Sequence, residues 1–314
     1  MALSSLALAA LVALAPDTVL LVLNKAEHTL VVVDPVALRV VGRVATGTGP
    51  HEVAVAPDGR TAYVTNYGDR QAGHSISVVD LGTLTARELP LDSLGRPHGI
   101  VMAGGRVYFT AEVNQAVARL DEPAVGVDWV ARTGQLATHM VVASPDGRAL
   151  YTANVGSASV TRLTLATGEV RHIAVGPQPE GIALSPDGGE LWVGHNGDGA
   201  VSVIDVRTEV VIATLPVGTM PIRLAFTPDG GRILASDARA DAVVVIDAHR
   251  RAVIGRIPVP GTPIGLVPSS DGRRAFVSRS QAGGIAVLDL ERLAVVAEVE
   301  TGLGPDGLAW AARP

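Results

Sequence analysis

A segment of about 42 residues recurs along this chain, and the repetition limits the possible folds more than any other feature. Its copies begin at Gly49, Arg96, Ala137, Gln178, Met220, Thr262 and Gly304. A fixed period of about 20 to 50 residues is typical of arrays in which each copy is one supersecondary unit packed against its neighbours. We therefore expect a repeat architecture rather than one large core.

One copy, residues 49–90, has the pattern of four short strands. Alternating apolar residues at 51–56 end in the turn sequence Pro57-Asp58-Gly59, and the second strand is TAYVTN at 61–66. A polar loop at 67–73 follows, and then SISVVD at 75–80 and residues 84–91 complete the copy. Four antiparallel strands with turn signals between them are typical of one propeller blade.

The two ends of the chain complete a circle. Residues 17–45 have the pattern of strands two, three and four of a blade, and residues 307–311 supply the missing first strand. Pairing these segments would remove a free sheet edge. Six complete copies and one split copy predict an all-β, seven-bladed β-propeller that forms a single domain over residues 16–314.

Composition narrows the class further. Aromatic residues make up only 3% of the chain, which favours many short strands of Val, Leu and Ile over a few aromatic cores. The net charge is −6 and no basic run occurs, so we do not expect the protein to bind nucleic acid. The chain has no cysteine, which excludes disulfides and thiolate metal sites.

The N-terminus indicates export. Residues 6–14 are apolar and Ala13-Leu14-Ala15 resembles a small-residue cleavage site, so residues 1–15 are either a signal peptide or a lead-in to the first strand. No Lys or Arg precedes the apolar stretch, and Pro16-Asp17 breaks it before it could span a bilayer. We expect a periplasmic or secreted protein without a transmembrane segment; the alternative is a cytoplasmic one.

Several strings identify a family resemblance. Tyr63-Val64-Thr65-Asn66, Ser77-Val78-Val79-Asp80 and the repeated Pro-Asp-Gly turns resemble the YVTN family of β-propeller repeats over nearly the whole chain. Similar propellers include lactonases, metal-dependent lyases, haem d1-binding domains, periplasmic binding proteins and adhesion modules. The resemblance implies the fold and leaves the activity open.

The third position of each copy is the best sequence clue to function. Its residues are His51, His98, His139, Glu180, Ile222, Ile264 and Asp306. The blade geometry places this ring at one mouth of the central channel. Three imidazoles and a carboxylate suit a borderline divalent ion such as zinc, iron, nickel or copper, so we predict His51, His98, His139 and Glu180 as metal ligands. The alternative is that these polar groups line a water-filled channel.

The ends of the second strands form a neighbouring ring on the same face, which includes Asn66, Asn154, His195, Asp237 and Arg279. Asn66 and Asn154 are candidate ligand contacts, and Arg223 and Arg279 are candidates to hold a carboxylate or phosphate. His195 and Asp306 are candidate acid–base groups. By contrast, the aspartates that end third strands or occupy Pro-Asp-Gly turns are expected to cap turns.

Three functions remain open. The first is an exported, monomeric propeller that binds a metal or a small molecule without turnover. The second is a metal-dependent lactonase- or lyase-like enzyme that uses the same His/Glu site. The third is a non-catalytic protein-interaction scaffold.

Overall fold

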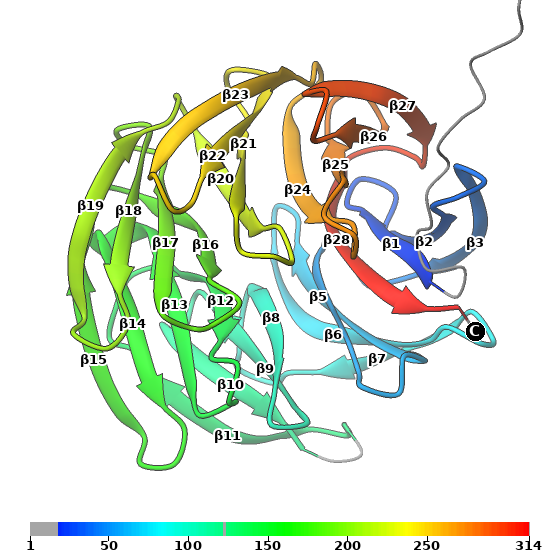
Figure 1. Cartoon of the computed structure of the whole chain (residues 1–314). Coiled ribbons are helices and arrows are strands. Elements are labelled where there is room, and N and C mark those ends of the chain that lie inside the picture. Colours follow the sequence, from blue (N-terminus) through cyan, green and yellow to red (C-terminus); the bar gives the residue numbers. More distant parts are fainter. Residues whose placement is uncertain (1–17, 122–123, 314) are drawn as a thin grey trace, which may run out of the picture.

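The structure, a computed structural model, describes residues 18–121 and 124–313. Within them, 28 strands form seven four-stranded sheets arranged around a centre (Figure 1). The blades, numbered 1 to 7, are β4–β7, β8–β11, β12–β15, β16–β19, β20–β23, β24–β27, and β28 with β1–β3. The predicted seven-bladed, all-β propeller is confirmed.

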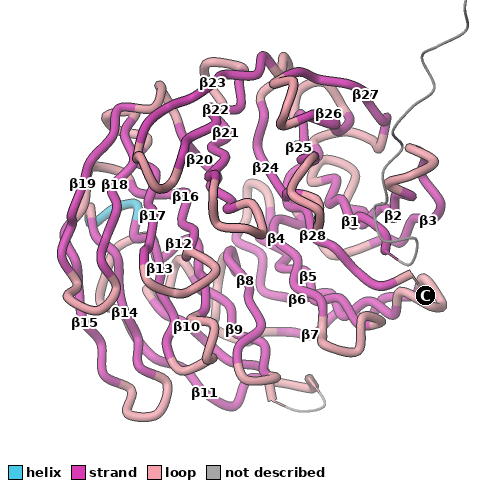
Figure 2. Tube along the Cα trace, in the orientation of Figure 1, coloured by secondary structure: helices cyan, strands magenta, loops and turns pink. Residues whose placement is uncertain are grey.

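Blades 1 to 3 comprise β4 (Pro50–Val55), β5 (Thr61–Gly68), β6 (Ala72–Asp80), β7 (Thr85–Pro90), β8 (Pro97–Ala103), β9 (Arg106–Ala111), β10 (Ala116–Leu120), β11 (Val127–Arg132), β12 (Thr138–Ala143), β13 (Ala149–Asn154), β14 (Ser159–Thr164) and β15 (Glu169–Ala174). A single 3-10 turn, η1 (Val155–Ser157), follows β13 within the described residues (Figure 2).

Blades 4 to 7 comprise β16 (Pro179–Leu184), β17 (Glu190–His195), β18 (Ala200–Asp205), β19 (Val210–Pro216), β20 (Pro221–Phe226), β21 (Arg232–Asp237), β22 (Ala242–Asp247), β23 (Ala252–Pro258), β24 (Pro263–Pro268), β25 (Arg274–Arg279), β26 (Gly284–Asp289), β27 (Ala294–Glu300), β28 (Pro305–Ala312), β1 (Thr18–Asn24), β2 (Thr29–Asp34) and β3 (Arg39–Ala45).

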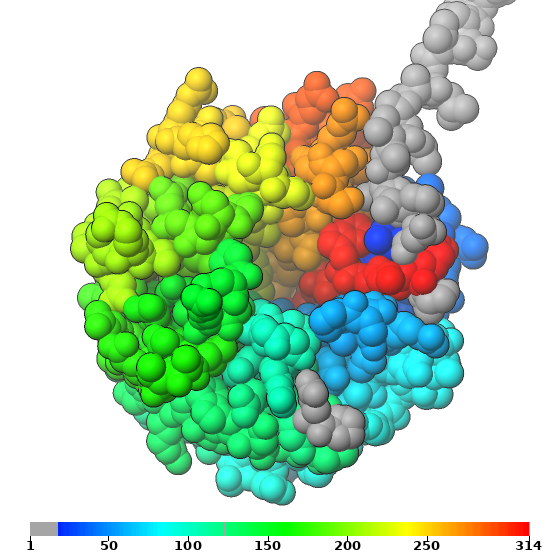
Figure 3. Space-filling model, turned by 60° about the horizontal axis from the view of Figure 1, so that its bottom comes forward, coloured from blue at the N-terminus to red at the C-terminus, as the bar shows by residue number. Residues whose placement is uncertain are grey.

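The C-terminal strand closes the ring, as expected. β28 pairs antiparallel with β1, so that Leu21 lies opposite Ala309 and Val19 opposite Ala311. Figure 3 shows this C-terminal segment in red beside the blue N-terminal part of the ring. The closure joins segments from opposite ends of the chain, so the innermost strand of blade 7 comes from the C-terminal end.

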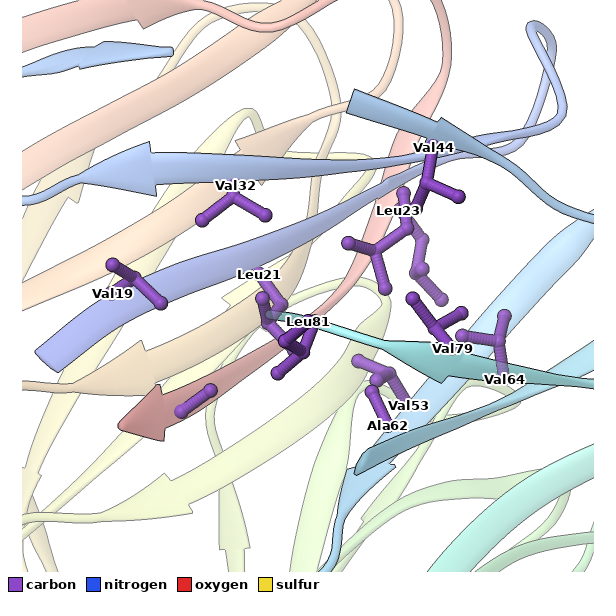
Figure 4. Close-up of a cluster of buried hydrophobic side chains, with 12 residues drawn as sticks. Val19, Leu21, Leu23, Val32, Val44, Val53, Ala62, Val64, Val79 and Leu81 are labelled. Atoms are coloured by element: carbon purple, nitrogen blue, oxygen red, sulfur yellow. The ribbon is translucent and has the colours of Figure 1, made fainter. Parts of the chain in front are cut away.

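The cores lie between neighbouring blades. On β1, Leu21 and Leu23 pack with Val53 and Val64 of blade 1, as the close-up in Figure 4 shows. The alternate residues Leu20 and Val22 face blade 6. Because successive side chains of a strand point to opposite faces, a blade buried on both faces needs a continuous apolar run, which explains the sequence VLLVLN.

The predicted turn aspartates act as caps. Asp58 accepts hydrogen bonds from the main-chain N–H groups of Arg60 and Thr61, at 2.8 and 3.0 Å, and Asp80 does the same for Gly82 and Thr83. These main-chain hydrogen bonds are the largest cause of the lowered pKa of both carboxyls. Repetition of this aspartate thus serves the turns rather than catalysis.

One predicted loop is shorter than expected. The sequence predicts a polar loop at residues 67–73, but β5 continues to Gly68 and β6 begins at Ala72, so blade 1 carries a longer hairpin than the other blades. The possible signal peptide, residues 1–15, lies outside the described residues. In the part of the chain that is described, no helix has the length and apolarity needed to cross a membrane.

Candidate functional site

The start of every innermost strand carries a bulge or a similar irregularity in its pairing. The pairing register shifts between Pro50 and Val53 on β4, and a shift occurs at the corresponding place in all seven blades. A bulge breaks the strict alternation of side chains along a strand. Consecutive residues such as His51 and Glu52 therefore both join the same cluster.

Hydroxyl groups of the second strands fix the bulges. Thr65 Oγ1 accepts a hydrogen bond from Glu52 N at 3.1 Å and donates one to the carbonyl of His98 in the next blade at 2.7 Å. Thr110 repeats this arrangement between Gly99 N and the carbonyl of His139. We call this arrangement the hydroxyl latch. It sets the positions of His98 and His139 through their own main chain.

The predicted histidines come together as a stack. The ring centroids of His51 and His98 are 4.0 Å apart, and those of His98 and His139 are 3.5 Å apart with an interplanar angle of 31°. His98 is fully buried and neither of its ring nitrogens has a hydrogen-bond partner. Since almost all buried polar groups are satisfied, this stack is an unusual place in the fold.

Carboxylates lie at both ends of the stack. His51 Nδ1 is 3.2 Å from Asp306 Oδ2. At the other end, His139 Nδ1 is 3.4 Å from Glu112 Oε1 and its Nε2 is 3.6 Å from Glu180 Oε1. Of the four predicted metal ligands, His139 and Glu180 thus lie side by side.

Arg223 connects the carboxylates across the channel. It is buried in blade 5 and pairs closely with Glu52 of blade 1; its Nη2 lies 3.8 Å from Asp306 Oδ1 and its Nη1 lies 3.9 Å from Glu180 Oε1. Burial alone would lower the pKa of Arg223, but these carboxylates, Glu52 foremost, raise it. The guanidinium stays charged and is already occupied by the protein's own carboxylates.

Burial divides the three histidines into two kinds. It holds the pKa of His51 and His98 well below the usual range, and the nearby positive charges of Lys25, Arg223 and His139 add to this effect. Burial also acts to lower the pKa of His139, but the carboxylates Glu112 and Glu180 outweigh it and raise that pKa. Near neutral pH, His51 and His98 are therefore neutral and His139 tends toward the imidazolium.

The second ring does not open into the channel. Asn66 Nδ2 donates to the hydroxyls of Ser75 and Ser77, and Asn154 Nδ2 donates to those of Ser159 and Thr161. These bonds brace the blade interior. Both asparagines are buried within their own blades.

His195 and Arg279 occupy the same ring position as these asparagines. The buried ring of His195 lies against Gly176, in the loop that enters blade 4, and its Nδ1 is 3.4 Å from Asp198 Oδ1. Arg279 pairs closely with Glu298 on the fourth strand of its own blade. The structure thus places both side chains with their own blades, whereas Asp306 and Arg223 lie in the cluster.

Sequence reasoning missed four residues of the cluster, which are Lys25, Glu52, Tyr67 and Glu112. Glu52 was hidden by the bulge, because simple alternation turns it away from His51. Tyr67 packs edge-on against the rings of His51 and His98, and its hydroxyl donates to Glu112 Oε2 at 2.7 Å. A signal for Tyr67 was present: the first spacing in the repeat, from His51 to His98, is longer than the others.

The chain is a seven-bladed β-propeller. Its seven four-stranded sheets and its YVTN-like sequence strings both indicate this class of protein. No family model matches the sequence. A curated relative is the seven-bladed beta-propeller protein Rv1057 of Mycobacterium tuberculosis, 31% identical over 159 residues. That match covers 49% of this chain and 37% of the relative, so the chain matches well under half of that protein.

Solved structures share the fold at low identity. The periplasmic gluconolactonase PpgL of Pseudomonas aeruginosa is 20% identical with a TM-score of 0.77, over 95% of this chain and 99% of that one. A putative 6-phosphogluconolactonase of Bacteroides uniformis is 14% identical with a TM-score of 0.80, over 94% and 100%. Hydrazine synthase of Kuenenia stuttgartiensis is 22% identical with a TM-score of 0.75, over 84% and 90%. These similarities concern the fold alone.

The hydroxyl latch gives a first prediction. Thr65→Val keeps the side-chain shape but removes the partner of the part-buried N–H of Glu52 and of the buried carbonyl of His98, so we expect the free energy of unfolding to fall by about 1–3 kcal/mol. Thr85→Val, at an exposed position on β7, is the matched control and should have little effect. Chemical denaturation measures both. Equal stability of the two variants would contradict the latch.

The neutral His98 gives a second prediction. The pKa of His98 is lower in the folded protein than in the unfolded chain, so the unfolded chain binds a proton at this residue more readily. The free energy of unfolding is therefore highest above about pH 6.5 and decreases as the pH falls toward the pKa of the folded state. His98→Phe removes this linkage and should flatten the slope of unfolding free energy below pH 6.5 by up to about 1.4 kcal/mol per pH unit. Urea denaturation at several pH values measures the slope. An unchanged slope would mean that His98 takes up no proton on unfolding.

Proposed function

We propose that the protein binds a divalent cation and a small polar molecule at the mouth of its channel. One observation carries this proposal: a ligand atom from each of His51, Glu52 and Asp306 lies within 4.8 Å of the other two. His51 Nδ1 and Asp306 Oδ1 are also buried without a hydrogen-bond partner. A buried imidazole nitrogen beside two carboxylates is a set of atoms that a divalent ion can use.

The chemistry of these donors fits a borderline ion. A neutral imidazole with carboxylate oxygens suits zinc, iron, nickel or copper. Three carboxylates, Glu52, Glu180 and Asp306, lie around the single guanidinium of Arg223, so this part of the cluster is rich in oxygen ligands for a cation.

The quartet predicted from the sequence shares His51 with this group. His98 and His139 are stacked face to face, and the lone pair of an imidazole nitrogen lies in the ring plane, so two stacked rings do not aim nitrogens at one point. For the full set of His51, His98, His139 and Glu180 to bind one ion, these rings must rotate. We therefore centre the proposal on His51, Glu52 and Asp306 and treat His98, His139 and Glu180 as a wider set.

The protein's own cations compete for the same oxygens. Arg223 pairs with Glu52, and Lys25 Nζ lies 3.7 Å from Asp306 Oδ2. Lys25 is partly exposed and can turn toward solvent, whereas Arg223 is buried. Binding of a divalent ion thus requires the Lys25 side chain to move away from Asp306.

This competition sets the test. Calorimetric titration with zinc should show one site, and His51→Ala or Asp306→Asn should weaken it by at least about tenfold to a hundredfold, a loss seen even for outer-shell partners. Lys25→Ala should instead strengthen binding by about fivefold or more, because a like charge is removed. His249→Ala, on the opposite face, is the control. No zinc affinity in the folded wild-type protein, or equal affinity in His51→Ala, would refute the site.

The second candidate is a lactonase- or lyase-like enzyme at the same site, and a specific arrangement favours it. His139, held between Glu112 and Glu180 at one end of the stack, is a group that can keep a proton. Asp306, which is buried beside His51 with a pKa raised by burial, can accept a proton. A bound cation would supply polarisation of a carbonyl or of water. His195, the other predicted acid–base group, lies against Gly176 in the loop that enters blade 4 and is not part of the cluster.

Hydrolysis of gluconolactone by the zinc-loaded protein tests this candidate. We expect Asp306→Asn to reduce kcat/KM by about a hundredfold or more, in line with loss of a general acid–base group. His195→Asn should keep most of the activity if His195 serves only its blade, because asparagine occupies the same position in blades 1 and 3. An absence of hydrolysis in a protein that binds zinc would leave the binding function and exclude this lactone as substrate.

Further parts of the proposal rest on the sequence. We propose an exported, monomeric protein because of the apolar stretch at residues 6–14 and the closed ring. A protein-interaction scaffold is the alternative if neither cation nor small molecule binds.

A further inference from the structure

Blade 1 carries an insertion at the channel mouth. Eight residues, 67–74, separate the paired residues Asn66 and Ser75 that end its second strand and begin its third. Four residues occupy the corresponding place in each of the other six blades. Inserted loops on a rigid scaffold often carry function. The first residue of this insertion, Tyr67, lies against the histidine stack.

Two basic side chains lie over the ring of Tyr67. Lys25 Nζ is 5.1 Å and Arg96 Cζ is 4.7 Å from the ring centroid. Lys25 comes from blade 7 and Arg96 from the loop that enters blade 2, so three neighbouring blades meet at this point. Lys25 is also the only lysine among the 25 lysine and arginine residues of the chain. Each position is within cation–π range of the aromatic face.

Both basic groups have donors to spare. The nearest carboxylate oxygen to Lys25 belongs to Asp306, at 3.7 Å, which is beyond hydrogen-bond distance. Arg96 makes one long hydrogen bond, 3.4 Å, to the main-chain carbonyl of Asp69, although a guanidinium has five N–H donors. Glu112, the nearby carboxylate, already accepts from Tyr67 and contacts His139. Lys25 is thus only loosely paired with Asp306, and Arg96, although Glu112 is nearby, keeps most of its N–H donors for another acceptor.

We propose that Lys25 and Arg96, held against Tyr67, bind the acidic group of a small-molecule ligand, either a carboxylate or a phosphate. This inference rests on the proposed binding function and names its ligand class. Because Lys25 also lies beside Asp306, the acidic group is held next to the His51, Glu52 and Asp306 group. A ligand with an acidic group and a neighbouring polar group suits this arrangement. Its acidic group would bind the ammonium of Lys25 and the guanidinium of Arg96, and its polar group would lie beside His51, Glu52 and Asp306.

The sole lysine makes a direct experiment possible. Protein labelled with ¹³C and ¹⁵N in lysine gives one set of side-chain signals from the chain, which belongs to Lys25. Titration with inorganic phosphate and, separately, with acetate should shift these signals saturably, and the stronger of the two identifies the preferred acid. Sodium chloride at matched ionic strength is the control for screening. Shifts that sodium chloride reproduces, or no shift with either anion, would overturn the proposal.

Variants complete the test. Arg96→Gln should weaken the saturable binding by about tenfold or more, since a hydrogen bond to a charged group is lost, and Arg96→Lys should restore part of it. Arg70→Gln, at an exposed arginine in the β5–β6 hairpin that carries Tyr67, is the control and should bind as the wild type does. Equal affinity in Arg96→Gln would overturn the role of Arg96.

Running the titration on metal-free and on zinc-loaded protein separates the two proposals. Anion binding without any zinc affinity would support this inference and contradict the cation site. Zinc binding without anion binding would support the cation site and overturn this inference. The sign of the Lys25→Ala effect adds a further distinction, since it should strengthen zinc binding and weaken anion binding.

Discussion

The contact between neighbouring innermost strands is the constraint on which the rest of the molecule depends. A hydroxyl such as that of Thr65 joins the bulge of its own blade to the carbonyl of His98 in the next. The approach is so close that a side chain at Gly307 would collide with the carbonyl of His51, and one at Gly265 with that of Asp306. Blade spacing and the positions of the channel residues are thus set by the same main-chain contacts.

A second consequence is that charges from distant blades meet in a buried space. Arg223 of blade 5 contacts carboxylates of blades 1, 4 and 7, while His139 of blade 3 lies between Glu112 and Glu180. Buried ion pairs are costly unless they are well matched, and replacing them with apolar groups often increases stability. Such a network, together with unpartnered atoms on His51 and His98, is the observation on which the proposed binding function rests.

The sequence was sufficient for the fold because local and global signals agree. The recurring strands, the Asp-capped turns and the split blade of β28 with β1–β3 all appear in the described part of the structure as expected. The proximity of His51, His98 and His139 also followed from the repeat. The sequence pattern did not predict features that depend on local geometry. The bulge of β4 brings Glu52 into the cluster, and local hydrogen bonds hold Asn66 and Asn154 within their own blades. Lys25 joined the site through the turn after β1, and Tyr67 joined it through the extension of β5 to Gly68, which the predicted strand at 61–66 did not include.

The central claim is that His51, Glu52 and Asp306 bind a divalent ion at the channel mouth. Anomalous diffraction at the zinc edge, from crystals grown with equimolar zinc, tests it most directly. The account predicts one strong peak at about 2.0–2.2 Å from a His51 ring nitrogen and from oxygens of Glu52 and Asp306, with Lys25 turned away from Asp306. A well-ordered channel mouth without a peak, with Lys25 still beside Asp306 and zinc bound only elsewhere, would contradict it.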